Sequence, residues 1–215
     1  MKALITGTSD GIGRAVAQKF LAEGWEVAGI DVAPAPFVKA GYTHVIADIS
    51  AGELPEIAGV NALINNAGVQ NTGRDVEVNL KATMRVTEKY AFQGDIKSVL
   101  FIASASATTG AEFPEYAASK GGVVAYMKNV AMRLAEFGAM ANSLSPGGVL
   151  TQSNARVMND RRMWEEIMSL TPLKKWATEE EIAEFAYFLI AVNKSMTAQD
   201  ILVDNGESSN FKFVW

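Results

Sequence analysis

The sequence has no cysteine and only one histidine, His44, among its 215 residues. The lack of cysteine excludes disulfides, thiolate nucleophiles and thiolate metal sites. A single histidine also leaves no cluster of the kind that binds transition metals, so the sequence predicts no metal site. His44 precedes an apolar segment, and we expect its side chain to pack there or to face solvent.

Long apolar runs and basic runs are missing as well. No apolar stretch approaches the roughly 20 residues of a membrane span, and the run that ends at Gly7 is too short for a secretion signal. A net charge of -5 without clustered Lys or Arg disfavours binding to a phosphate backbone. These absences predict a soluble, cytoplasmic protein with no membrane partner and no nucleic-acid partner.

Short apolar segments alternate with longer segments of helical character. The predicted strands are residues 2–6, 25–31, 44–47, 60–65, 97–104, 139–144 and 200–203, and the predicted helices are residues 12–23, 115–137, 156–170 and 179–191. Strands that alternate with helices form a parallel sheet covered on both faces. We therefore expect an α/β fold with a single doubly wound parallel sheet, Rossmann-type with three α/β/α layers, as one domain over residues 1–215. Ligands of such sheets bind at the carboxyl ends of the strands.

A glycine-rich turn directly follows the first predicted strand. Its glycines permit a tight turn and a close approach of a pyrophosphate to the backbone, and the next helix offers its N-terminus to the anion. The turn lacks the Lys-Ser/Thr pair that a P-loop needs after its last glycine. It therefore predicts dinucleotide binding. The candidate cofactor contacts in this turn are Gly7, Ser9, Asp10, Gly11, Ile12 and Gly13.

Asp31 stands at the end of the second predicted strand, 18 positions after Gly13. A spacing of roughly 20 residues is typical of the acid that binds the adenosine ribose of NAD. A carboxylate there repels a 2′-phosphate, and neither Asp10 nor Val32 supplies a cation to attract one. These residues favour NAD over NADP.

Further motifs follow the glycine turn in a defined order. They are Asp48-Ile49, Asn65-Asn66-Ala67-Gly68, Asn79, Ser104, Tyr116-Ala117-Ala118-Ser119-Lys120, Pro146-Gly147-Gly148-Val149-Leu150-Thr151 and Val203-Asp204-Asn205-Gly206. In this order, and over nearly the whole chain, they resemble the motifs of the short-chain dehydrogenase/reductase family. Asn205 replaces a glycine of the usual pattern.

The resemblance implies an NAD-dependent oxidoreductase that transfers a hydride between the cofactor and a CH–OH or C=O group. It implies a small-molecule substrate and a homo-oligomer, a tetramer with helices around 75–92 and 115–137 at one interface. The implied catalytic residues are Asn79, Ser104, Tyr116 and Lys120. The further implied cofactor contacts are Asp48, Ile49, Asn66, Ala67, Gly68, Tyr116, Lys120, Pro146, Gly147, Val149 and Thr151.

Tyr116 and Lys120 are four residues apart on a predicted helix, so their side chains share one face. A free tyrosine has a pKa of about 10 and is a poor proton donor-acceptor near neutral pH. A cation one helical turn away favours the phenolate and lowers that pKa, which suits general acid–base catalysis. The resemblance adds that Lys120 binds the nicotinamide ribose and that Asn79 supports a proton relay.

The catalytic serine is open between two candidates. Ser104 follows the fifth predicted strand, where the family has its serine, but its spacing of twelve to Tyr116 is one shorter than the family habit. Ser106 is therefore the alternative.

The substrate is expected on the side of residues 152–172, which carry Met158, Met163, Trp164 and Met168. This segment could pack an apolar stripe on the core, close over the substrate as a lid, or do both. A second hypothesis for the chain as a whole is a non-catalytic dinucleotide-binding sensor or scaffold. The complete set of implied catalytic residues argues against that hypothesis.

Overall fold

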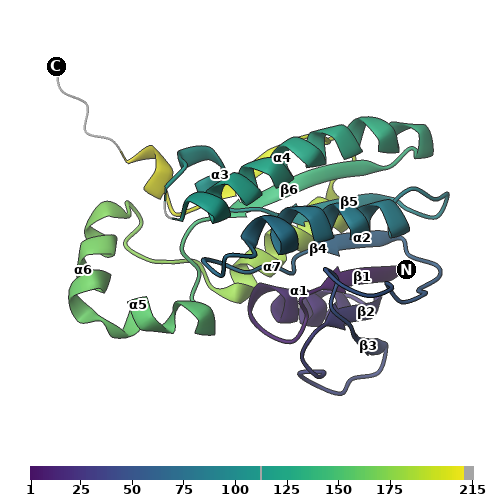
Figure 1. Cartoon of the computed structure of the whole chain (residues 1–215), viewed down its shortest axis with the longest axis horizontal. Helices are drawn as coiled ribbons and strands as arrows, with labels where there is room; N and C mark the ends of the chain where they lie inside the picture. Colours follow the sequence, from purple (N-terminus) through teal and green to yellow (C-terminus); the bar gives the residue numbers. More distant parts are fainter. Residues whose placement is uncertain (112, 211–215) are drawn as a thin grey trace.

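The computed structural model describes residues 1–111 and 113–210 and has a seven-stranded parallel sheet at its centre (Figure 1). The strand order is β3-β2-β1-β4-β5-β6-β7. The strands are β1 (Lys2–Thr6), β2 (Glu26–Asp31), β3 (Tyr42–Ile46), β4 (Ala62–Asn65), β5 (Ser98–Ile102), β6 (Met140–Pro146) and β7 (Asp200–Val203). The order reverses between β1 and β4, the point at which such sheets bind ligands. The doubly wound Rossmann-type sheet expected from the sequence is confirmed. The expected domain range 1–215 includes residues 112 and 211–215, which lie outside the described residues.

Helices cover both faces of the sheet. They are α1 (Gly11–Ala22), α2 (Thr83–Tyr90), α3 (Ser106–Thr109), α4 (Pro114–Leu134), α5 (Ala155–Asn159), α6 (Arg161–Leu170) and α7 (Glu179–Tyr187). Phe20 of α1 and Ile182 of α7 belong to the apolar core on one face. Val86 of α2 and Met127 of α4 belong to the core on the other face. The three expected layers are therefore present.

The crossover from β3 to β4 has no helix among the described residues, in agreement with its short, glycine- and proline-interrupted sequence. Gly52 and Gly59 have positive φ values of 59° and 70°, which break regular structure. Leu54 and Val60 are 6% and 2% exposed and pack into the core. Two apolar side chains of a loop thus cover the face that a helix covers elsewhere.

The prediction of one continuous helix over residues 156–170 is wrong, because Asp160 divides this segment into α5 and α6. The backbone of Asp160 is extended (φ -93°, ψ 102°), and its carboxylate accepts the N–H of Met163 at 3.0 Å. Asp160 is therefore the N-cap of α6, a role that aspartate favours over a position inside a helix.

Candidate active site

Hydrogen bonds join the glycine turn after β1 to the turn after β4. Thr6 Oγ1 accepts the backbone N–H groups of Asn66 and Ala67 at 3.0 and 3.1 Å. The side-chain amide of Asn66 donates to the carbonyl oxygens of Thr6 and Gly7, both at 3.0 Å. Two of the predicted motifs therefore meet at the carboxyl ends of adjacent strands.

Two glycines of this turn, Gly7 and Gly13, leave no room for side chains. A Cβ on Gly13 would overlap the carbonyl oxygen of Gly7, and Gly7 itself has a φ of +74°. A Cβ on Gly11 would lie 3.8 Å from Cγ2 of Thr151. The segment after β6 therefore reaches the same turn, with Thr151 buried beside it.

The Asp31 carboxylate lies against the glycine turn. Its Oδ2 accepts the N–H of Ser9 and its Oδ1 accepts the N–H of Ala33, both at 2.9 Å. Asp10 is exposed and lies 3.5 Å from Arg14, which also forms an ion pair with Glu179 at 3.0 Å. Thus the cation on the first turn of α1 already has two carboxylate partners.

Asp48 and Ile49 lie beyond the end of β3, at the same edge of the sheet. Asp48 accepts the N–H and the hydroxyl of Ser50 at 2.8 and 2.6 Å, and these bonds hold the pKa of Asp48 below its usual range. Ile49 is buried, and its carbonyl oxygen accepts a hydrogen bond from Arg85 at 3.2 Å. These bonds stabilise a local turn and do not themselves reach the glycine turn.

Tyr116 and Lys120 lie on the first turns of α4. Lys120 is only 5% exposed, and its Nζ donates to the carbonyl oxygen of Ile102 at 2.9 Å. The Nζ lies 5.7 Å from the centre of the Tyr116 ring. Burial lowers the pKa of Lys120 to about 8, although the carboxylate of Asp75 acts in the opposite direction. The structure thus places a buried amine with a lowered pKa beside the predicted acid/base.

Asn79 belongs to a π-helical turn (Val76–Ala82) that precedes α2. Its Oδ1 accepts the N–H of Val69 at 2.7 Å, and its Nδ2 donates to the Val69 carbonyl at 2.9 Å and to Ser119 at 3.0 Å. A Cβ on Gly68 would lie 3.1 Å from Asn79 Oδ1 and 3.5 Å from Lys120 Nζ. Gly68, Asn79 and Lys120 therefore form one cluster. Widened π turns are frequent at functional sites, and this one places Asn79 there.

Both candidate serines are buried at the carboxyl end of β5. Ser104 Oγ lies 3.2 Å from Ser106 Oγ and also accepts the Ser106 N–H at 3.2 Å. The structure places the two hydroxyls together beside the start of α3, and the choice between them stays open.

The segment after β6 is packed tightly at two glycines. A Cβ on Gly147 would lie 2.7 Å from Cβ of Asp204, and a Cβ on Gly148 would overlap the ring of Trp176. Val149 is 4% exposed and forms a parallel bridge with Ala177. These contacts hold the backbone that follows Pro146 at the edge of the site.

Asp75 is a member of this site that the sequence analysis missed. It is fully buried, and its carboxylate accepts the N–H groups of Asn71 and Thr72 at 2.7 and 2.8 Å. Burial raises the pKa of Asp75, but the N–H groups that bind its carboxylate outweigh that effect, and the pKa is lowered. The available signal was an acid four residues before Asn79 that follows the turn formers Asn71, Thr72 and Gly73.

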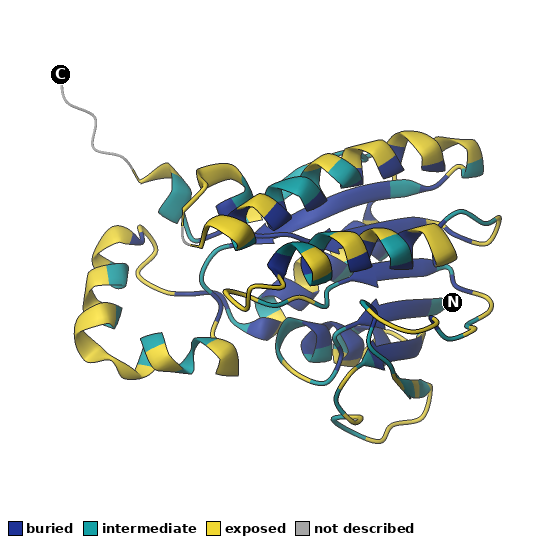
Figure 2. Cartoon of the chain, in the orientation of Figure 1, coloured by how far each residue is buried: buried dark blue, intermediate teal, exposed yellow. Residues whose placement is uncertain are grey.

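Residues 152–172 extend away from the sheet (Figures 1 and 2). Neither α5 nor α6 has a buried residue. This segment therefore does not pack a fully buried apolar stripe on the core. Trp164 of α6 contacts the buried ring of Trp176 edge-on, with ring centres 5.1 Å apart. The buried Thr151 directly precedes the segment, and Thr171, next to its last residue, is also buried.

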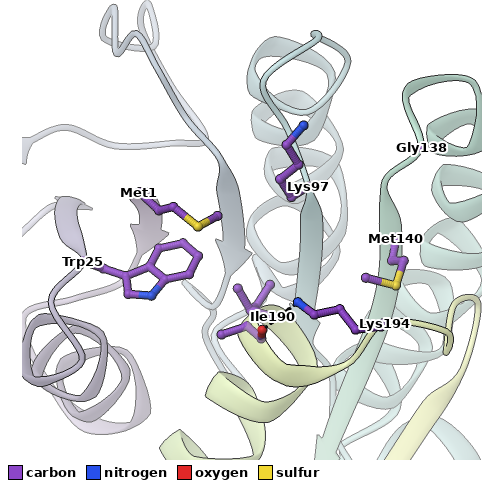
Figure 3. Close-up of a pocket in the computed structure, with 8 residues that line it drawn as sticks. Met1, Trp25, Lys97, Gly138, Met140, Ile190 and Lys194 are labelled. Carbon is purple, nitrogen blue, oxygen red and sulfur yellow. Dashed lines mark hydrogen bonds between the residues drawn. The ribbon is translucent and has the colours of Figure 1, made fainter.

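A hollow of about 340 Å³ opens at the opposite end of the sheet, where the strands begin (Figure 3). Its lining includes Met1, Trp25, Lys97, Met140 and Lys194, and none of the predicted site residues. Within the described chain, no group of three or more acidic, histidine or cysteine side chains is arranged to hold a metal. No helix in the described part is long and apolar enough to cross a membrane.

Comparisons with known proteins find relatives over nearly the whole chain. A family model described as "Enoyl-(Acyl carrier protein) reductase" matches residues 46–208. A short chain dehydrogenase from Penicillium roqueforti is 30% identical over 95% of this chain and 96% of its own length. A glucose 1-dehydrogenase from Gluconobacter oxydans is 29% identical over 95% of this chain and 91% of its own length.

Solved structures share the fold. A protein provisionally described as a 2-deoxy-D-gluconate 3-dehydrogenase from Agrobacterium tumefaciens, with bound NADP, is 26% identical with a TM-score of 0.86. The similarity covers 97% of this chain and 96% of that one. A 4-hydroxyisoleucine dehydrogenase with bound NADH has a TM-score of 0.87 at 22% identity, over 97% of this chain and 98% of that one.

Proposed function

We propose a cofactor and a mechanism for this chain, which belongs to the short-chain dehydrogenase/reductase family and is an oxidoreductase of alcohol or carbonyl substrates. The proposed reaction is hydride transfer between NAD(H) and the CH–OH or C=O group of a small molecule. Tyr116 is the proposed general acid/base. The observation that carries this proposal is the buried Lys120 beside Tyr116, in one cluster with Asn79 and Gly68.

The residues around the glycine turn fit a nicotinamide dinucleotide. Gly7 and Gly13 leave bare backbone at the N-terminus of α1, a helix of 12 residues, where N–H groups and the helix dipole attract a pyrophosphate. The Asp31 carboxylate, at the end of β2, can accept hydrogen bonds from ribose hydroxyls. The residues after β6 would meet the nicotinamide.

The preference for NAD over NADP rests on charge. Asp31 would repel a 2′-phosphate, and Arg14 is already paired with Asp10 and Glu179. A related structure contains bound NADP, so NADP is the competing cofactor that the Asp31 carboxylate would have to disfavour.

In the proposed mechanism, the bound nicotinamide supplies the hydride for carbonyl reduction. Tyr116 Oη donates its proton to the carbonyl oxygen, which receives the electron pair of the C=O π bond. The Lys120 ammonium stabilises the phenolate that remains, and a hydroxyl of Ser104 or Ser106 binds the substrate oxygen. Asn79, whose amide is bonded to Val69 and Ser119, holds the Gly68 turn beside Lys120. Alcohol oxidation runs the same steps in reverse.

Two further expectations remain proposals. Residues 152–172 form the substrate side, because they leave the sheet directly after Thr151 at the glycine turn. A homo-oligomer is proposed with α2 and α4 at one interface. Met84 and Met132 are exposed apolar residues of these helices, 38% and 61% exposed.

A fluorescence titration of the purified protein with NADH and with NADPH tests the cofactor proposal. Because of Asp31, NADH should bind at least tenfold more tightly, which corresponds to about 1.4 kcal/mol. Asp31→Ser should reduce that preference. Tighter binding of NADPH by the unaltered protein would overturn the argument from charge.

A further inference from the structure

The only histidine of the sequence connects the two turns that would hold the adenosine half of the cofactor. His44 lies on β3, opposite Gly29 of β2 in the parallel register. Its Nε2 lies 2.9 Å from the carbonyl oxygen of Ala33, which only accepts, so Nε2 carries a hydrogen and donates it. Its Nδ1 lies 2.8 Å from Tyr42 Oη and 3.5 Å from Thr8 Oγ1.

Tyr42 extends this chain of hydrogen bonds into the glycine turn. Its hydroxyl lies 2.9 Å from Oγ1 of Thr8, a fully buried residue between Gly7 and Ser9. Hydroxyl groups both donate and accept, so the chain can be satisfied from His44 to Thr8. Phe37 packs on the Tyr42 ring with 4.6 Å between the ring centres.

Gly29 is an independent sign that the sequence makes room for this network. A Cβ at position 29 would overlap Thr8 Oγ1 and lie 2.5 Å from Tyr42 Oη. Glycine inside a strand is otherwise unfavourable, and it often marks a place of close approach. Here the Thr8 and Tyr42 hydroxyls take the space of the missing side chain.

Ala33 links His44 to Asp31 through two backbone hydrogen bonds. The N–H of Ala33 donates to Asp31 Oδ1 at 2.9 Å, and its carbonyl accepts His44 Nε2 at 2.9 Å and Ser9 Oγ at 3.2 Å. The imidazole therefore fixes the residue that orients the carboxylate proposed to bind ribose. Ser9 Oγ also donates to the Pro34 carbonyl at 2.9 Å, so these bonds direct it to backbone oxygens and not to the imidazole.

We infer that His44 is a positioning residue for the adenosine side of the cofactor site, where it sets NADH affinity and the preference over NADPH through Ala33 and Asp31. The inference rests on the proposed function. His44 lies on β3 and contacts none of the catalytic candidates through its described bonds, so it affects cofactor binding and leaves the chemical step unchanged.

The test measures NADH and NADPH affinity, turnover at saturating NADH, and thermal unfolding for His44→Ala, His44→Gln and Tyr42→Phe. Thr43→Ala is the matched control, because Thr43 is the exposed neighbour on the same strand. Loss of one or two hydrogen bonds should weaken NADH binding about three- to tenfold in His44→Ala. NADPH affinity should change less, and turnover should stay within about twofold.

His44→Gln keeps an N–H donor for Ala33 and should recover part of the affinity. Tyr42→Phe loses the hydrogen bonds to Thr8 and to His44 Nδ1 but keeps the bond from His44 to Ala33, so it should be intermediate. The inference is wrong if folded His44→Ala keeps both the affinity and the cofactor preference of the unaltered protein. If His44→Ala does not fold, unchanged affinities in both His44→Gln and Tyr42→Phe would overturn it instead. Failure of the unaltered protein to bind either dinucleotide would overturn the proposed function, a separate outcome.

Discussion

Helix α4 carries Tyr116 and Lys120, helix α6 belongs to the proposed substrate segment, and the two helices differ in how far their side chains are buried. On α4, Lys120 is buried, and so are Met127, Val130 and Leu134 further along the helix. On α6 no residue is buried (Figure 2). Its last residue, Leu170, is 56% exposed. The groups proposed to move protons must be held within about 0.5 Å, and a packed helix holds side chains more precisely than a loop does. A segment that contacts substrate can be less constrained, because exposed segments tolerate movement and change.

The largest expected effect concerns Tyr116. Tyr116→Phe removes the proposed proton donor and keeps the ring, so turnover should fall about 100- to 10,000-fold, the usual contribution of general acid–base catalysis. NADH affinity should stay within about twofold, as measured by titration. Turnover close to that of the unaltered protein would place the chemistry elsewhere.

A matched pair of methionines sharpens the comparison between the helices. Met127→Ala on α4 removes a side chain with no exposed surface and should lower the free energy of unfolding by about 2–5 kcal/mol. Met163→Ala on α6 removes one that is 37% exposed and should cost less than about 0.5 kcal/mol. Denaturant unfolding measures both. Equal losses would show that α6 is packed as firmly as α4.

A smaller effect is expected in the pH profile. Burial lowers the pKa of Lys120 to about 8, so its ammonium is present below that pH and lost above it. Carbonyl reduction should therefore decline as the pH rises through about 8. Asp75 opposes the lowering, so Asp75→Asn should shift the decline to lower pH.

Asp200→Asn is the control for this shift, because Asp200 is a carboxylate held by the hydroxyls of Ser143 and Ser145 on β6. It should leave the profile in place. If Asp75→Asn leaves the pH profile of carbonyl reduction unchanged, Asp75 does not influence the pKa of Lys120.

Local patterns in the sequence were enough to predict much of this fold. The first and last strands were predicted to the residue, because each is a short apolar run next to a turn former. The glycine turn and the Tyr116–Lys120 pair are also local patterns, and their order along the chain identified the family. The structure then brings the glycine turn and Asn66 together by hydrogen bonds.

Features that depend on contacts between distant residues could not be predicted. Thr8 and His44 are 36 positions apart, and no local pattern in either segment predicts their contact. The burial of Asp75 and the π turn at Asn79 depend on how the connection between β4 and α2 packs against α4. The sequence pattern also did not show that Asp160 ends one helix and caps the next.

The most direct test of the account is isotope transfer with a ketone that the protein reduces in a screen of sugars, steroids and acyl thioesters. The reaction is run in ordinary water with NADH that carries deuterium on the transferable position of C4, and the product alcohol is analysed by mass spectrometry. Direct hydride transfer predicts one deuterium on the carbinol carbon. A product alcohol without deuterium on that carbon would contradict the account.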